Sequence, residues 1–247
     1  MIKNKISLAG LIIVALAAVI GLSALAKNNS DIPKGLEDKG PLTKITFIHY
    51  KDGHVKPVVG AGKPKVTQCY GFLSSGAKWK TIEDYYINPL NSGLDTAFAA
   101  SAINAGATEW EKYGGNIFGS GIVDTNVLYD DSMVDGKNVV AFGLYPDPNV
   151  IAVTTVWGYF LGSPKTRQLV EWDMLFNTYF VWGDAAVNSS LMDLQNIATH
   201  EIGHSAGMAD LYNTSCNLET MYGYSSEGEI IKRDLHNGDI AGIQALY

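Results

Sequence analysis

The run His200-Glu201-Ile202-Gly203-His204 holds the residues best suited to do chemistry in this sequence. Histidines at positions i and i+4 project from one face of an α-helix, so both imidazoles can reach a single metal ion, Zn²⁺ by preference. Glu201 lies beside them and can accept a proton from a metal-activated water. The spacing therefore predicts a helix that carries a hydrolytic metal centre.

The residues after this run supply a third ligand. Gly207 follows His204 by three positions, where a glycine can end a helix through a left-handed turn. Such a turn would bring the carboxylate of Asp210 back toward the same ion. We therefore predict His200, His204 and Asp210 as metal ligands and Glu201 as the catalytic base.

The complete string, H-E-x-x-H-x-x-G-x-x-D, resembles that of the metzincin metalloproteases, in which Asp210 replaces the usual third histidine, as in the snapalysin type. Glu219-Thr220-Met221-Tyr222-Gly223 resembles their Met-turn, with Met221 beneath the metal. Residues 238–247 are similar to the terminal helix of the matrixins. Upstream, Lys78-Trp79, Trp110 and residues 171–177 also resemble matrixin segments. The resemblance covers residues 78–247 and is dense only after residue 196.

The resemblance implies an α/β (α+β) metzincin-like catalytic domain with a twisted mixed five-stranded sheet, an active-site helix, a Met-turn and a C-terminal helix. It implies a zinc endopeptidase with one catalytic Zn²⁺ and a peptide or protein substrate. The substrate would add to the sheet as an extra β-strand along an edge strand. That strand is expected at Val170, Glu171, Trp172, Asp173, Met174, Leu175 and Phe176.

The sequence departs from the matrixin pattern in three places. A carboxylate at Asp210 lowers the net charge at the metal, which makes a bound water less acidic. The chain has no histidine between His54 and His200, so the second, structural zinc of animal matrixins is not expected. Gly223 and Tyr224 follow Tyr222, so the shape of the specificity pocket does not carry over.

Some further residues could have either a functional role or an ordinary structural role. The lone histidines His49, His54 and His236 are expected in ordinary surface or core positions, and Tyr212 and Tyr224 in packing. An acidic stretch could hold Ca²⁺. Because it lacks the regular D-x-D-x-D-G spacing of a calcium-binding loop, we favour its interpretation as a solvated loop. Its members are Asp124, Asp130, Asp131 and Asp135.

The first 26 residues are typical of an export signal: two lysines, an apolar run and a small-x-small site at Ala24-Leu25-Ala26. The apolar run of 21 residues is also long enough for an uncleaved membrane anchor. Either interpretation places the body outside the cytoplasm, secreted or on the outer face of the membrane. Residues 27–77 are interpreted as an N-terminal extension or pro-region, and residues 78–247 as the catalytic domain.

Hydrophobic periodicity and turn residues predict the elements of the body. Helices are expected at residues 94–113, 190–206 and 239–247. Strands are expected at residues 46–50, 84–88, 123–128, 138–142, 150–157, 169–176 and 179–182. This order favours a layer of helices on a mixed sheet.

Cys69 and Cys216 are the two cysteines of the chain and lie 147 residues apart. An exported chain favours a disulfide between them. The alternative is a latency switch, in which the Cys69 thiolate occupies the open metal position, as in matrixins. The surrounding residues share little with the matrixin switch string.

Charge excludes one class of partner. Residues 27–247 hold 16 Lys and Arg against 25 Asp and Glu, a net charge of −9, with no basic cluster. A nucleic-acid partner is therefore not expected. We expect a monomer that meets a membrane only through the N-terminal segment. Two other functions stay open: a metal-containing binding or adhesion module without turnover, and a hydrolase of a non-peptide substrate.

Overall fold

The structure, a computed structural model, describes residues 39–54 and 68–247. These residues belong to one compact unit, Glu37–Tyr247. The predicted signal or anchor, residues 1–26, lies outside the described residues. Within the described ranges, no helix is both long enough and apolar enough to span a bilayer.

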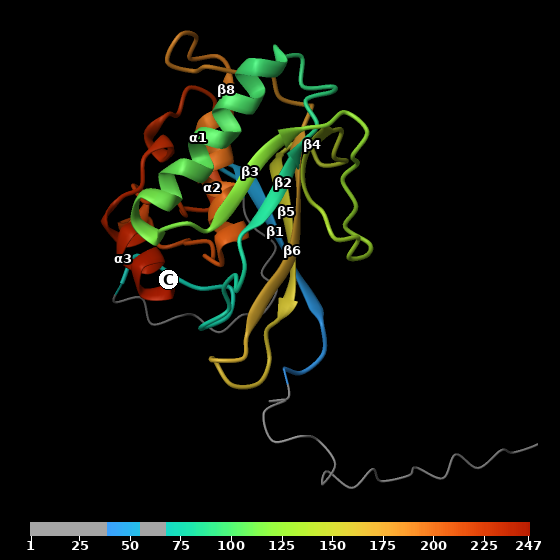
Figure 1. Cartoon of the computed structure of the whole chain (residues 1–247). Helices are drawn as coiled ribbons and strands as arrows, with labels where there is room; N and C mark the ends of the chain where they lie inside the picture. The colour runs from blue at the N-terminus through green and yellow to red at the C-terminus, as the bar shows by residue number, and fades with distance from the viewer. Residues whose placement is uncertain (1–38, 55–67) are drawn as a thin grey trace, which may run out of the picture. The chain divides into compact units, whose positions relative to one another are not determined.

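The unit is a mixed sheet with its helices packed on one face, which confirms the predicted α/β metzincin-like class (Figure 1). The strands run in the order β3-β2-β4-β6-β5-β1-β9. Neighbours from β3 to β6 are parallel, β5 is antiparallel to both β6 and β1, and β9 is parallel to β1. The strands of this sheet are β1 (Thr43–Lys51), β2 (Glu83–Ile87), β3 (Phe118–Val123), β4 (Asn138–Gly143), β5 (Val150–Tyr159), β6 (Gln168–Asn177) and β9 (Tyr224–Ser225).

The prediction of five strands was wrong, because the sheet has seven in the described residues. One additional strand, β1, comes from the predicted extension, residues 27–77. It pairs with β5 from Thr43↔Gly158 to Tyr50↔Val150. The other, β9, is a two-residue strand that pairs with the end of β1. The extension therefore contributes a strand to the same sheet as residues 78–247.

The prediction that residues 170–176 form an edge strand was also wrong. They lie within β6, which pairs with β4 on one side and with β5 on the other. The polar side chains of this strand are covered: Glu171 accepts backbone N–H bonds from Asp135 and Gly136, and Asp173 accepts them from Asp130 and Val139. A hydrogen-bonded carboxylate can occupy a buried strand, and sequence alone does not show that pairing.

Two predicted strands are displaced. Of the strand expected at residues 179–182, only Trp182 belongs to a strand, the two-residue β7 (Trp182–Gly183). The expected strand at residues 123–128 is instead β3, which ends at Val123. Its glycines lie close against β2: a Cβ on Gly119 would contact Asp84, and one on Gly121 would contact Tyr85. Asp84 Oδ1 also accepts the N–H of Ser120 at 2.7 Å. Glycine weakens the strand signal in the sequence but permits this close approach.

In the part of the chain that the structure describes, three helices cover the sheet: α1 (Thr96–Gly114), α2 (Leu194–Ala206) and α3 (Asn237–Leu246). Short elements connect them: β7 (Trp182–Gly183) paired with β8 (Met192–Asp193), and the 3₁₀ turns η1 (Thr214–Cys216) and η2 (Ile231–Arg233). Figure 1 shows α1 and α2 side by side, and the Trp110 indole N–H donates to the Thr199 carbonyl at 2.7 Å across them. The buried core lies between these helices and the sheet.

Helix α2, which carries the H-E-x-x-H run, has strong signals at both ends. The Asp193 carboxylate caps its start by accepting the Asn196 N–H at 2.8 Å. Its end is Gly207, whose φ of 106° lies in the left-handed region. A Cβ there would also lie 2.8 Å from the Ala77 carbonyl oxygen. The helix therefore ends at Gly207, as the sequence predicts.

Candidate metal centre

Helix α2 holds the three residues of the predicted centre in a buried position. His200 and Glu201 are 0% exposed and His204 is 1% exposed. The Nδ1 of His200 contacts the Thr220 carbonyl oxygen at 2.7 Å, and the Nδ1 of His204 contacts that of Met208 at 3.0 Å. A carbonyl can only accept, so each Nδ1 carries the proton and each Nε2 presents a lone pair. This is the tautomer that a histidine requires to bind a metal through Nε2.

Asp210 completes the group. Its Oδ1 lies 3.2 Å from the Nε2 atoms of both His200 and His204. The ligand atoms of these three residues lie within 4.8 Å of one another. Two imidazole nitrogens and one carboxylate oxygen form a donor set that suits Zn²⁺. The residues present therefore fit the metal that the sequence predicts.

Tyr212 supports this carboxylate, a role that the sequence analysis missed. Its hydroxyl donates to Asp210 Oδ2 at 2.7 Å, on the oxygen opposite the one that faces the histidines. A hydrogen bond of this kind orients a ligating carboxylate. The sequence feature that could have predicted this role is the position of Tyr212 two residues after Asp210. The hydrogen bond, however, depends on the turn between the two residues.

Glu201 lies between two partners. Thr154 Oγ1, on β5, donates to its Oε2 at 2.6 Å, and His49 Nδ1 lies 2.9 Å from its Oε1. Burial raises the pKa of Glu201 above its usual value. A raised pKa brings a carboxylate closer to the range in which it both accepts and returns a proton near neutral pH.

The prediction of an ordinary role for His49 was wrong. The side chain is 1% exposed, lies against Glu201 and packs its ring on His200 with centroids 3.9 Å apart. Two residues earlier on the same strand, Phe47 stacks on His204 with centroids 3.8 Å apart. The sequence offers no spacing signal here, because about 150 residues separate β1 from α2.

Met221 forms the floor of this region. It is 0% exposed, and a Cβ on Gly203 would contact its sulfur and the ring of Trp110. Asp239, near the start of α3, accepts the backbone N–H groups of Thr220 and Met221 at 2.6 and 3.1 Å. Asp239 thus ties the Met-turn to the last helix, a connection that sequence analysis also missed.

The acidic stretch has partners of its own. Asp124 accepts from Asn126, and Asp130 accepts from Ser132. In the described ranges, the groups of His, Cys, Asp and Glu close enough to share an ion are His49-His200-Glu201 and His200-His204-Asp210. Calcium at the acidic stretch gains no support from this arrangement.

Cys69 and Cys216 are joined by a disulfide, with Cα atoms 5.4 Å apart. The bond ties the segment before Trp79 to the turn η1, between Asp210 and Met221. In this state Cys69 has no thiolate to offer a metal. The latency mechanism based on Cys69 therefore does not operate in this structure.

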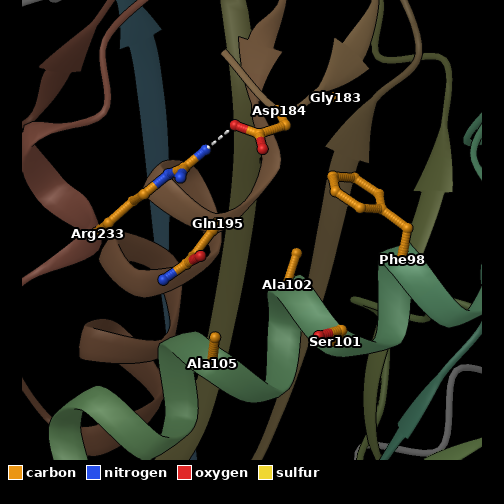
Figure 2. Close-up of a pocket in the computed structure, with 8 residues that line it drawn as sticks. All are labelled: Phe98, Ser101, Ala102, Ala105, Gly183, Asp184, Gln195 and Arg233. Carbon is orange, nitrogen blue, oxygen red and sulfur yellow. Dashed lines mark hydrogen bonds and ion pairs between the residues drawn. The ribbon is translucent and has the colours of Figure 1, made fainter. Parts of the chain in front are cut away.

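A separate cavity of about 100 Å³ lies away from these residues, between α1 and the start of α2 (Figure 2). Its charged members are Asp184 and Arg233, which pair at 2.5 Å, and Arg233 also pairs with Asp193. The guanidinium is therefore already neutralised by two carboxylates. The remaining lining residues are Phe98, Ser101, Ala102, Ala105, Gly183 and Gln195.

Comparison with known proteins places this centre in a family. Residues 132–247 match the family model described as matrixin. A search of curated proteins finds no match. The matched range contains α2, Asp210, Met221 and α3, and the family implies zinc binding and metalloprotease activity on peptide or protein substrates. The match therefore supports a matrixin-like metzincin over residues 132–247.

Proposed function

We propose that this chain is an exported zinc endopeptidase with His200, His204 and Asp210 as metal ligands and Glu201 as general base. The observation that supports it best is the convergence of three ligand atoms within 4.8 Å, directly beside a buried carboxylate. The basic start and apolar run of residues 1–26 support export.

Different side chains and backbone groups have different roles in the proposed hydrolysis. A bound zinc ion would polarise the scissile carbonyl and lower the pKa of a water at its open position. Glu201 accepts the proton of the attacking water and then delivers it to the nitrogen of the leaving amine. Thr154 holds Oε2 of Glu201, and Oε1, which His49 Nδ1 contacts in this structure, is the oxygen that would carry that proton. Carbonyls of Thr220 and Met208 keep both histidines in the ligating tautomer.

The test is hydrolysis of a peptide library and casein, with and without a chelator, and after Zn²⁺ is added back. Because β1 covers Glu201 and His200, the assay includes the variant Ile48→Pro, which disrupts that strand. We expect chelator-sensitive cleavage that zinc restores. Tight zinc binding without cleavage in either protein would support the binding module instead, and chelator-insensitive cleavage would contradict the proposal.

Two variants assign the roles. Glu201→Ala should keep one zinc per chain, measured by metal analysis, while hydrolysis falls by about 10²–10⁴-fold because proton transfer is removed. Asp210→Ala should instead lose zinc, whereas Asp210→His should retain it. Wild-type zinc affinity in Asp210→Ala would show that Asp210 is not a ligand.

A further inference from the structure

A groove on the surface, which we call the lysine groove, lies apart from the metal ligands. Its volume is about 440 Å³, within the range of about 300–1,000 Å³ that is usual for ligand sites. It lies between the segment before β2, the turn that joins β5 to β6, and the end of α3. Its charged and apolar walls come from Lys78, Lys80, Lys165, Phe72, Pro164 and Leu246.

The lysine groove is basic on a chain that is acidic. Residues 27–247 hold 16 Lys and Arg against 25 Asp and Glu, yet the residues that line the groove include three lysines and no carboxylate. In the described ranges, the lysines and arginines that form ion pairs are Lys51, Lys112, Lys232 and Arg233. The three ammonium groups of the groove are therefore not neutralised by a carboxylate of the described residues.

Contacts within the chain fix the walls of the groove. Arg167 donates from Nη1 to the Ser75 carbonyl at 2.8 Å and from Nη2 to the Gly162 carbonyl at 3.1 Å. These bonds tie the segment before β2 to the β5–β6 turn and place a further positive charge beside the groove. Gly76 lies directly against Pro164, because a Cβ on Gly76 would come within 2.6 Å of the Pro164 carbonyl oxygen. A groove with fixed walls loses little conformational entropy when it binds a ligand.

One of the three lysines has a structural role. Lys78 lines the groove together with the last residues of α3, and its Nζ lies 5.3 Å from the centre of the Tyr247 ring. A cation is favoured at the C-terminal end of a helix and over an aromatic ring. Lys80 and Lys165 are exposed and have no such contact within residues 39–54 and 68–247. These two lysines are therefore the ones to test for ligand binding.

The wall before β2 also contacts the metal centre. Phe72 pairs with Met208 in an isolated antiparallel bridge, and the Leu73 N–H donates to the Gly207 carbonyl at 3.0 Å. The Met208 carbonyl in turn holds Nδ1 of His204. A protein bound in the groove would therefore be held close to the turn that follows α2.

The chemistry of the walls favours a short acidic peptide over a long polyanion. Carboxylates would pair with the exposed ammonium groups, and apolar side chains would cover the apolar surface of Phe72 and Leu246. A polysaccharide, a nucleic acid or a membrane surface would extend beyond the groove over an acidic chain. Repulsion there acts over a Debye length of about 8 Å, which a short segment confined to the groove avoids.

We propose that the lysine groove is a docking site for an acidic peptide segment of a partner protein that also carries apolar side chains. Lys80 and Lys165 bind the carboxylates of this segment, and Phe72 contacts its apolar side chains. The inference goes beyond the proposed hydrolysis and does not depend on it.

Binding is measured with full-length Glu201→Gln chains, because the proposed hydrolysis then cannot consume the probe. The probe is a labelled peptide in which glutamate and leucine alternate, titrated by fluorescence anisotropy at physiological salt. Two control peptides carry glutamine in place of glutamate, or serine in place of leucine. We expect the probe to bind at least about threefold more tightly than either control, since each control removes one of the two kinds of contact.

Two double variants test whether the probe binds in the groove. Lys80→Glu with Lys165→Glu replaces two attractive charges by repulsive ones and should weaken binding at least about tenfold. Lys44→Glu with Lys137→Glu makes the same change of net charge at exposed lysines outside the groove, so it should weaken binding less than about threefold. Thermal unfolding verifies the fold of both proteins. An equal loss of binding in the two would assign it to overall charge and overturn the inference.

Other polyanions test the class of partner. Heparin and phosphatidylserine vesicles are titrated into the same proteins. If the peptide does not bind, the inference is overturned, and binding of heparin or vesicles that is lost in Lys80→Glu with Lys165→Glu would identify the other class. If the peptide binds in the groove but the chain with Glu201 intact hydrolyses no peptide, the docking site stands and only the proposed function fails.

Discussion

At the level of single residues, the geometry of this centre depends on groups behind the ligands. Each of the two histidines is held at Nδ1 by a backbone carbonyl, and Asp210 is held by the Tyr212 hydroxyl. Supporting bonds of this kind fix ligand orientation, and their loss weakens metal binding although every ligand remains. Tyr212 is the most testable of these groups, because its ring can be kept while its hydroxyl is removed.

We predict that Tyr212→Phe weakens zinc affinity by about 10–100-fold, the range typical for a lost outer hydrogen bond. Competition with a chromogenic chelator measures it. Tyr224→Phe is the matched control, because its ring packs against that of Tyr212 with centroids 5.5 Å apart. Unchanged affinity in Tyr212→Phe would remove this tyrosine from the site.

Asp173 gives the stability of the protein a pH dependence. Burial raises the pKa of its carboxyl to about 7, from an ordinary value near 3.8. Between these two values the folded state holds a proton that the unfolded state has released, so stability falls as pH rises. One such group contributes a slope of at most about 1.4 kcal/mol per pH unit.

We therefore predict that Asp173→Asn flattens the decline in unfolding free energy between pH 4 and pH 7, because the amide does not ionise. Urea denaturation at a series of pH values measures the slope. The exposed substitution Asp131→Asn should leave it unchanged. An identical slope in Asp173→Asn and the wild type would show that this carboxyl ionises normally in the fold.

At the level of elements, α2 is packed tightly on both sides. Gly106 of α1 lies against the backbone of α2, where a Cβ would come within 3.0 Å of the Thr199 nitrogen. Gly203 faces Met221 and Trp110 with no room for a side chain. The close approach of α1 and Met221 to α2 lets this helix bring both histidines to the turn that carries Asp210 while its other side contacts α1.

Gly203→Ala should lower the free energy of unfolding by about 1–3 kcal/mol, because overpacking displaces Met221 or Trp110. Gly71→Ala is the matched control, since its added Cβ would meet only Ala209 at an ordinary 3.7 Å. Chemical denaturation of both variants makes the comparison. A Gly203→Ala protein as stable as Gly71→Ala would show that the Met-turn can shift without cost.

At the level of the whole molecule, two long-range connections hold the Met-turn region in place. Asp239 binds its backbone from α3, and the Cys69–Cys216 disulfide ties η1 to the segment before β2. The disulfide closes a loop that spans 147 positions and includes most of the sheet. Its main effect is to restrict the unfolded chain.

Replacement of both cysteines by serine should destabilise the protein by about 2–5 kcal/mol, the usual loss for a native disulfide. Thermal unfolding of the variant and of the wild type with and without reductant measures this loss. If free Cys69 instead acted as a switch at the metal, Cys69→Ser alone would raise activity with no loss of stability. That outcome would contradict the disulfide role.

The sequence alone determined the parts of this protein that depend on local spacing. The i, i+4 histidines, the glycine that ends α2 and the Met-turn string all act within a few residues, so their consequences can be predicted without the fold. The matrixin-like class followed from those strings, and the family match over residues 132–247 confirms it.

The tertiary structure decided everything that depends on pairs distant in the chain. The position of β6 inside the sheet, the bonds from Asp239 to the Met-turn and the contact of His49 with Glu201 all join residues far apart in the chain. A strand pattern shows which side chains are buried but not which neighbour its backbone will bind. For that reason the sequence predicted a catalytic centre, and only the fold showed that a strand from residues 27–77 covers it.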